Sequence, residues 1–131
     1  MRIINMKKAL VVDDDEDFLF QEKKALEALG YSVETAGGRM EAMAKLENYK
    51  PDLALIDLMM EEKDSGFVLA HHIKKIKPAI PVILVTAVTS ETGIQFDMDS
   101  QGAHRWINAD AMLVKPVRVE QLKTAIEKVM A

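Results

Sequence analysis

The chain has 131 residues, a hydrophobic content of 49% and a formal net charge of −4. This length suits one domain with its own core, and the apolar content excludes a disordered chain. The acidic balance argues against direct contact with nucleic acid, because no basic stripe is present to neutralise phosphates. No apolar stretch approaches the roughly 20 residues of a membrane span, and without cysteine there is no disulfide framework. We therefore expect a cytoplasmic domain that works with protein partners and without a membrane.

Short apolar runs alternate with helical patterns along the chain. In chain order, the pattern predicts a strand at 8–13, a helix at Glu16 to Leu29, a strand at Tyr31 to Thr35, a helix opened by Gly37-Gly38, a strand from Leu53 to Asp57, a helix at Ser65 to Ile76, a strand at 81–85, a strand at Ala111 to Val114 and a helix at Val119 to Met130. The segment 88–110 is expected to contain one more helix. This alternation is typical of a parallel sheet covered by helices.

Polar residues follow four of the predicted strands. The apolar runs end on Asp13-Asp14-Asp15, on Asp57, on Thr86-Ala87 and on Lys115-Pro116. In a parallel sheet, functional groups gather beyond the carboxyl ends of the strands. We therefore expect one crevice lined by Asp13, Asp14, Asp57, Thr86 and Lys115.

Four segments carry a family resemblance. LVVDDDED, LALIDLMM, ILVTA and MLVKPV resemble, in order and at close to its spacing, the receiver domain of bacterial two-component response regulators. The resemblance runs from about Lys8 to Val129. It implies a doubly wound, flavodoxin-like α/β fold with a five-stranded parallel sheet in the order 2-1-3-4-5. It also implies that residues 1–131 are a single receiver domain, with a short N-terminal extension at 1–7 and no output domain.

The acidic residues suit phosphoryl transfer. A carboxylate can attack a phosphoryl group, but a cation must then offset the repulsion from the neighbouring carboxylates. Mg²⁺ fits this need, since it prefers oxygen ligands and uses few carboxylates beside substrate phosphate. By the resemblance, Asp57 is the phosphoacceptor and also contacts the metal. Asp14 matches the direct Mg²⁺ ligand, Asp13 matches the acid that often binds the metal through water, and Met59 matches the ligand that offers its backbone carbonyl.

The remaining site residues match the family's switch. Lys115 corresponds to the lysine that pairs with the acyl phosphate, and Thr86 to the hydroxyl that turns toward the phosphoryl oxygen; Ala87 follows it. Pro116 matches a proline whose preceding peptide bond is typically cis. Met112 stands where the family commonly has an aromatic residue that swings inward, so this chain departs from the usual output coupling.

The function that the resemblance implies is that of a signalling module. A sensor histidine kinase or a phosphotransfer protein would supply the phosphoryl group to Asp57 with Mg²⁺, and the module would signal through an unidentified protein. It would assist its own phosphorylation and dephosphorylation without acting as an enzyme on a separate substrate.

Three other interpretations stay open at this stage. The run of three acids could simply cap the first helix, either through Asp15 or through the acids that follow it. A pseudo-receiver would bind partners without phosphorylation, although the intact acidic set and Lys115 argue against it. A haloacid-dehalogenase-type phosphatase would use Asp13 and Asp15 as its Asp-x-Asp pair. Asp17 then stands where threonine or valine is expected, and Asp57 is left without a role.

Overall fold

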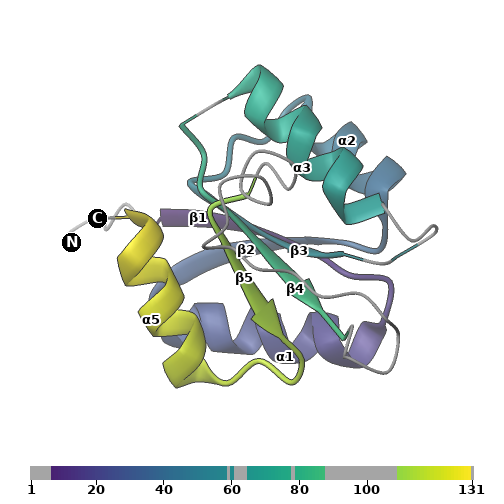
Figure 1. The fold of residues 1–131 in the computed structure, drawn as a ribbon. Coiled ribbons are helices and arrows are strands. Elements are labelled where there is room, and N and C mark those ends of the chain that lie inside the picture. The colour runs from purple at the N-terminus through teal and green to yellow at the C-terminus, as the bar shows by residue number, and fades with distance from the viewer. Residues whose placement is uncertain (1–6, 59, 61–64, 78, 88–108, 131) are drawn as a thin grey trace, which may run out of the picture.

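The computed structural model describes residues 7–58, 60, 65–77, 79–87 and 109–130 (Figure 1). Five strands form one sheet, and all neighbouring strands in it are parallel. In chain order the elements are β1 (Lys7–Val12), α1 (Glu16–Ala28), β2 (Tyr31–Ala36), α2 (Arg39–Leu46), β3 (Leu53–Asp57), α3 (Ser65–Ile76), β4 (Val82–Thr86), β5 (Ala111–Val114) and α5 (Val119–Met130). The strand order is β2-β1-β3-β4-β5. The predicted doubly wound, flavodoxin-like fold and its strand order are confirmed.

The sheet lies between two layers of helices. Figure 1 shows α1 and α5 on one face of the sheet and α2 and α3 on the other. Alternate residues of each strand serve the two faces, as the period of a strand requires. In β3, Leu55 packs with the α1/α5 side, and Ala54 and Ile56 pack with the α2/α3 side. Because both faces are covered, the central strands are apolar along nearly their whole length.

The register aligns the ends of the strands. Val12 pairs with Ile56, Ile56 with Leu84, and Leu84 with Met112. The next level therefore holds the residues that follow Val12 and Ile56, which are Asp13 and Asp57. This parallel register brings acids that are distant in the sequence to the same edge of the sheet.

Helix α1 begins where the sequence predicts and ends one residue before its predicted end. Asp15 is the N-cap, and its side chain accepts hydrogen bonds from the backbone N–H groups of Asp17 and Phe18. The helix ends before Gly30, which has a φ of 96°, a conformation that glycine adopts without steric cost. The helix carries an apolar stripe of Phe18, Leu19, Ala25, Leu26 and Leu29, of which Ala25 and Leu26 are buried. The same face also buries Glu22, which the sequence analysis did not identify.

Several predicted boundaries are wrong by one or two residues. The first strand ends at Val12 and not at residue 13, because the Asp13 side chain already accepts a hydrogen bond from the backbone N–H of Asp15 and starts the turn. The first helix ends at Ala28, with Leu29 as its C-cap. The fourth strand is Val82–Thr86. The helix expected within 88–110 falls largely on residues 88–108, which lie outside the described residues.

Within the part of the chain that the structure describes, no helix is both long and apolar enough to cross a bilayer.

Candidate functional site

Three carboxylates meet at the carboxyl edge of the sheet. Asp13 follows β1, Asp57 is the last residue of β3, and Asp14 is the neighbour of Asp13. One carboxylate oxygen from each of the three lies within 4.8 Å of the others. Asp13 and Asp57 are buried, whereas Asp14 is exposed. The predicted meeting of these acids is therefore found in the structure.

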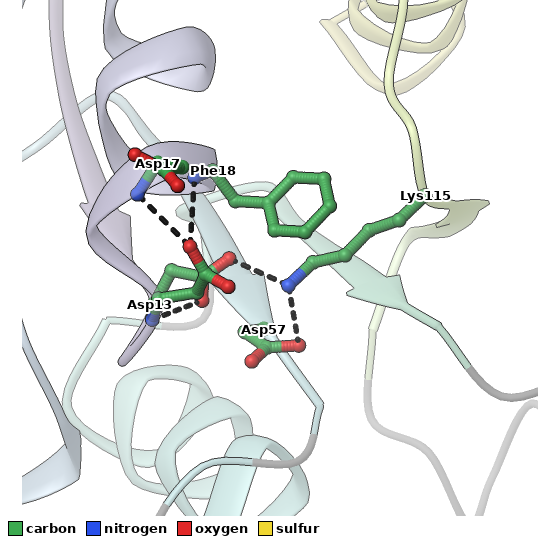
Figure 2. A network of polar contacts seen from close by, with 6 residues as sticks. Asp13, Asp17, Phe18, Asp57 and Lys115 are labelled. Atoms are coloured by element: carbon green, nitrogen blue, oxygen red, sulfur yellow. Dashed lines mark hydrogen bonds and ion pairs between the residues drawn. The ribbon is translucent and has the colours of Figure 1, made fainter.

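Lys115 bridges two of these acids. Its Nζ lies 2.8 Å from Asp13 Oδ2 and 3.5 Å from Asp57 Oδ1 (Figure 2). The lysine side chain is 8% exposed, so both ion pairs are largely shielded from water. The backbone N–H of Lys115 donates to the carbonyl of Thr86 at 2.8 Å, which fixes the end of β5 beside the end of β4.

Strand alternation explains why these three side chains meet. Leu55 and Leu113 face the α1/α5 side of the sheet. Two residues further along the same strands are Asp57 and Lys115, which continue that alternation. Asp13 follows Val11 in the same way. The acids and the lysine thus share the face that α1 covers.

The charges of the site are unbalanced. Burial, and next the charge of Asp13, raise the pKa of the Asp57 carboxyl above its ordinary value, and the ammonium of Lys115 only partly offsets this. Burial alone would lower the pKa of Lys115, but its contacts with Asp13 and Asp57 outweigh burial and raise it. Three carboxylates facing one ammonium leave an excess of negative charge. A further cation would relieve that excess, and oxygen donors this close together suit a hard divalent ion such as Mg²⁺.

The three acids that follow β1 differ in the contacts that their side chains make. The backbone N–H of Asp15 donates to Asp13 Oδ1 at 2.9 Å, which orients the Asp13 carboxylate. The Asp15 side chain points the other way along the chain, since its Oδ1 accepts the N–H of Asp17 at 2.9 Å and of Phe18 at 3.3 Å. The helix-cap interpretation is therefore correct for Asp15 and does not account for Asp13 or Asp14.

The start of α3 packs directly on the backbone beyond Asp57. The N–H of Gly66 donates to the carbonyl of Leu58 at 2.8 Å, and the N–H of Leu58 donates to the carbonyl of Val85 at 2.8 Å. A Cβ at Gly66 would lie 2.5 Å from the Asp57 carbonyl oxygen and 2.5 Å from Leu58 Cα. Only glycine fits this contact, so the helix holds the backbone of the acidic strand end in place.

The other predicted site residues are distributed around this edge. Thr86 is buried at the end of β4, and Ala87 is exposed beside it. Met112 is half-buried in β5 and packs on the α2/α3 side. The peptide bond between Lys115 and Pro116 is cis, as the resemblance implies. Met59 lies outside the described residues.

Two residues of α1 that the sequence analysis did not assign to the site lie against it. Lys115 Nζ is 4.2 Å from the centroid of the Phe18 ring. Glu22 is 3% exposed, and its Oε2 has no hydrogen-bond partner among the described residues. Burial, followed by the charge of Asp13, raises the pKa of Glu22 to about 8. The available signal was helical spacing: Glu22 lies four residues from both Phe18 and Leu26, in the middle of the apolar stripe.

One known protein family matches most of the chain. The family model of the response regulator receiver domain matches residues 9–127. The chain therefore belongs to the response regulator receiver domain family, a class of two-component signalling proteins.

Individual relatives are similar to this chain at moderate identity. The alkaline phosphatase synthesis transcriptional regulatory protein PhoP of Bacillus subtilis is 29% identical over 95% of this chain and 48% of its own length. The transcriptional regulatory protein RprY of Bacteroides fragilis is 34% identical over 94% of this chain and 49% of its own length. The chain thus spans about half the length of these two relatives.

Solved receiver structures agree with the whole described fold. A CheY-like receiver domain protein from Methanospirillum hungatei is 32% identical with a TM-score of 0.77, covering 96% of this chain and 95% of that one. The response regulator protein TrrA from Thermotoga maritima, solved in complex with Mg²⁺-BeF, is 31% identical with a TM-score of 0.76, covering 95% of this chain and 99% of that one.

Proposed function

We propose that this chain accepts a phosphoryl group on Asp57 from the phosphohistidine of a sensor histidine kinase or a phosphotransfer protein. The observation that carries the proposal is the cluster of Asp13, Asp14 and Asp57 within 4.8 Å, with Lys115 bridging the two buried acids. A lysine paired with the acceptor acid provides a cation beside the oxygen that would receive the phosphoryl group.

The transfer requires little covalent chemistry from the protein. An oxygen of the Asp57 carboxylate attacks phosphorus, the P–N bond of phosphohistidine breaks, and the imidazole leaves with its electron pair and takes up a proton. Lys115, already 3.5 Å from Asp57 Oδ1, pairs with the negative charge that the phosphoryl group brings. Thr86, at the end of the neighbouring strand, offers a hydroxyl to a phosphoryl oxygen. The aspartyl phosphate is later hydrolysed in the same site.

The metal is part of the proposal. When bound, Mg²⁺ offsets the repulsion between the carboxylates and the phosphoryl oxygens. Asp13, Asp14 and Asp57 would hold it, together with the backbone carbonyl of Met59. The site of the metal-bound relative TrrA supports this choice of ion by similarity.

The phosphatase alternative fits the geometry less well. It would need Asp15 as a second catalytic acid beside Asp13. The Asp15 carboxylate instead accepts two backbone N–H groups at the start of α1, which commits it to the helix cap. That arrangement leaves Asp57, and not Asp15, as the acid that joins Asp13 at the strand ends.

The partners follow from the chemistry. The phosphoryl donor is a protein with a phosphorylated histidine. We expect the two proteins to meet in the cytoplasm. The downstream partner is an unidentified protein. The curated relatives named above are transcriptional regulators of about twice this length. That this chain does not itself contact nucleic acid stays a prediction.

Intact-mass measurement tests the proposed acceptor. Wild type treated with acetyl phosphate and Mg²⁺ should gain one phosphate, and Asp57→Asn should gain none. Asp17→Asn, which removes an exposed acid in the first turn of α1, is the matched control and should be labelled like wild type. Equal labelling of wild type and Asp57→Asn would sink the assignment. Equal phosphorylation of wild type with and without Mg²⁺ would contradict the role of the metal.

A further inference from the structure

We propose that Phe18 is a positioning residue for Lys115, with its ring holding the lysine ammonium over Asp13 and Asp57. The inference rests on the proposed function only in giving Lys115 a part in phosphoryl transfer. The contact itself belongs to the folded chain.

The ammonium of Lys115 has three neighbours in the site. They are Asp13 Oδ2 at 2.8 Å, Asp57 Oδ1 at 3.5 Å and the Phe18 ring, whose centroid is 4.2 Å away. Figure 2 shows the ring and the Asp57 carboxylate on different sides of the ammonium. A cation within about 6 Å of a ring centroid is attracted by the electron-rich face, and more strongly where water is excluded. The lysine side chain is 8% exposed, so this contact is a shielded one.

The backbone of Phe18 is connected through Asp15 to Asp13, the acid that pairs with Lys115. Phe18 donates its backbone N–H to Asp15 Oδ1 at 3.3 Å, and Asp15 donates its own N–H to Asp13 Oδ1 at 2.9 Å. Asp13 in turn pairs with Lys115, which lies against the Phe18 ring. The four residues therefore form a closed circuit of contacts. Because this circuit joins the cap of α1 to the end of β5, the position of the ring depends on the acidic turn and not on α1 alone.

The ring restrains a flexible side chain. A lysine has a four-carbon stem and an ammonium that water solvates well, so an open site would let it turn outward. The ring blocks one route to solvent and attracts the charge at the same time. Since the transfer depends on positioning, a lysine that leaves the crevice would lower the rate of phosphorylation.

A second phenylalanine on the same helix provides a matched control. Lys24 Nζ lies 5.4 Å from the centroid of the Phe20 ring, and Phe20 is 61% exposed. This pair has the same chemistry as the pair of Phe18 and Lys115 but lies outside the site. Replacing Phe20 removes an equal ring from α1 without touching Lys115.

Amine labelling measures the position of Lys115 without requiring phosphorylation. Wild type, Phe18→Leu, Phe18→Tyr and Phe20→Leu are treated briefly with an acylating reagent, and each lysine is followed by peptide mass spectrometry. We expect Lys115 to react about three- to tenfold faster in Phe18→Leu, and at the wild-type rate in Phe18→Tyr and Phe20→Leu. Lys74, which pairs with Asp110 at 2.6 Å, is the internal reference.

The labelling results separate positioning from a general loss of structure. An unchanged rate at Lys115 in Phe18→Leu would overturn the inference, and so would an equal rise at Lys74 and Lys115. Phe18→Met, whose unbranched and flexible side chain fills irregular space more readily, is labelled in parallel in case Phe18→Leu does not fold. A selective rise at Lys115 in either variant supports the inference.

Phosphorylation kinetics then connect the position to the chemistry. With acetyl phosphate, which needs no protein partner, we expect Phe18→Leu to be phosphorylated about three- to tenfold more slowly, with the rate restored in Phe18→Tyr. Selective labelling without any phosphorylation of wild type would mean that the proposed function fails while the positioning role stands. Phosphorylation of Asp57 with unchanged labelling in Phe18→Leu would mean the reverse.

Discussion

Burial raises the pKa of two acids of this domain, although only one of them belongs to the cluster of three carboxylates. Asp57 ends β3, and Glu22 lies on the inner face of α1, yet burial is the main reason that the pKa of each carboxyl is raised. For Asp57, a cation can offset this cost. Glu22 has no hydrogen-bond partner for Oε2 among the described residues, so at higher pH it carries a poorly solvated charge.

Glu22 should make the stability of the domain depend on pH. Its pKa rises from the ordinary 4.5 to about 8 in the folded chain, so the unfolded chain loses this proton first. The free energy of unfolding should therefore fall as the pH rises between about 4.5 and 8, by at most about 1.4 kcal/mol per pH unit from this group. Glu22→Gln should flatten that slope, as measured by urea unfolding at several pH values in the presence of a chelator.

The exposed acid Glu16, also on α1, provides the control for that measurement. Glu16→Gln should keep the wild-type dependence on pH. Asp57 contributes a slope of the same sign, because its pKa is also raised, and that contribution should remain in both variants. Parallel pH profiles for wild type and Glu22→Gln would contradict the role given to burial.

Asp14 is the acid whose removal should affect the metal most cleanly. It is exposed, so Asp14→Ala should change the free energy of unfolding by no more than about 0.5 kcal/mol. It nevertheless belongs to the acidic cluster, so Mg²⁺ binding and phosphorylation by acetyl phosphate should weaken together. Calorimetric titration with Mg²⁺ measures the first, and intact mass the second. A variant that binds Mg²⁺ as tightly as wild type would remove Asp14 from the ligand set.

At the scale of elements, the contact between α3 and the end of β3 limits what the site tolerates. Gly66→Ala would place a Cβ 2.5 Å from two backbone atoms of Asp57 and Leu58, neither of which can yield as a side chain can. We expect a loss of roughly 1–3 kcal/mol in the free energy of unfolding and slower phosphorylation, because the helix and the acidic strand end must separate. Urea unfolding and acetyl phosphate kinetics measure the two effects.

Gly37 offers a matched control for that substitution. A Cβ there would meet only the carboxylate of Glu41, at 3.4 Å, and that side chain can move. Gly37→Ala should therefore leave stability and phosphorylation near the wild-type values. If the two alanine variants behaved alike, the packing of α3 on the strand end would not matter for the site.

The sequence predicted the helices, the strands and the meeting of the acids, but not all of the side-chain contacts of the site. Apolar runs and helical spacing predicted α3 and α5 at their observed bounds, because local periodicity determines both. The strand order came from the family resemblance and not from periodicity. The pairing of Lys115 with Asp13 depends on how far a long side chain reaches back across the sheet, which no local pattern contains. Glu22 was missed because a charged residue inside an apolar stripe has no local sign of burial.

At the scale of the whole domain, the sheet separates two groups of residues. Asp13, Asp57 and Lys115 continue strand positions that pack toward α1 and α5. Met112 packs toward α2 and α3. The two buried acids and Lys115 therefore belong to one face of the sheet, and Met112 belongs to the other.

The hydrogen bond between the N–H of Lys115 and the carbonyl of Thr86 joins the ends of β5 and β4. Lys115 follows the last residue of β5, and Thr86 is the last residue of β4, so this bond lies at the carboxyl edge of the sheet. Lys115, whose ammonium lies 3.5 Å from Asp57 Oδ1, is thus tied by its own backbone to the end of β4. A rearrangement around a phosphoryl group on Asp57 would therefore reach the neighbouring strand through a single backbone hydrogen bond at the edge of the sheet.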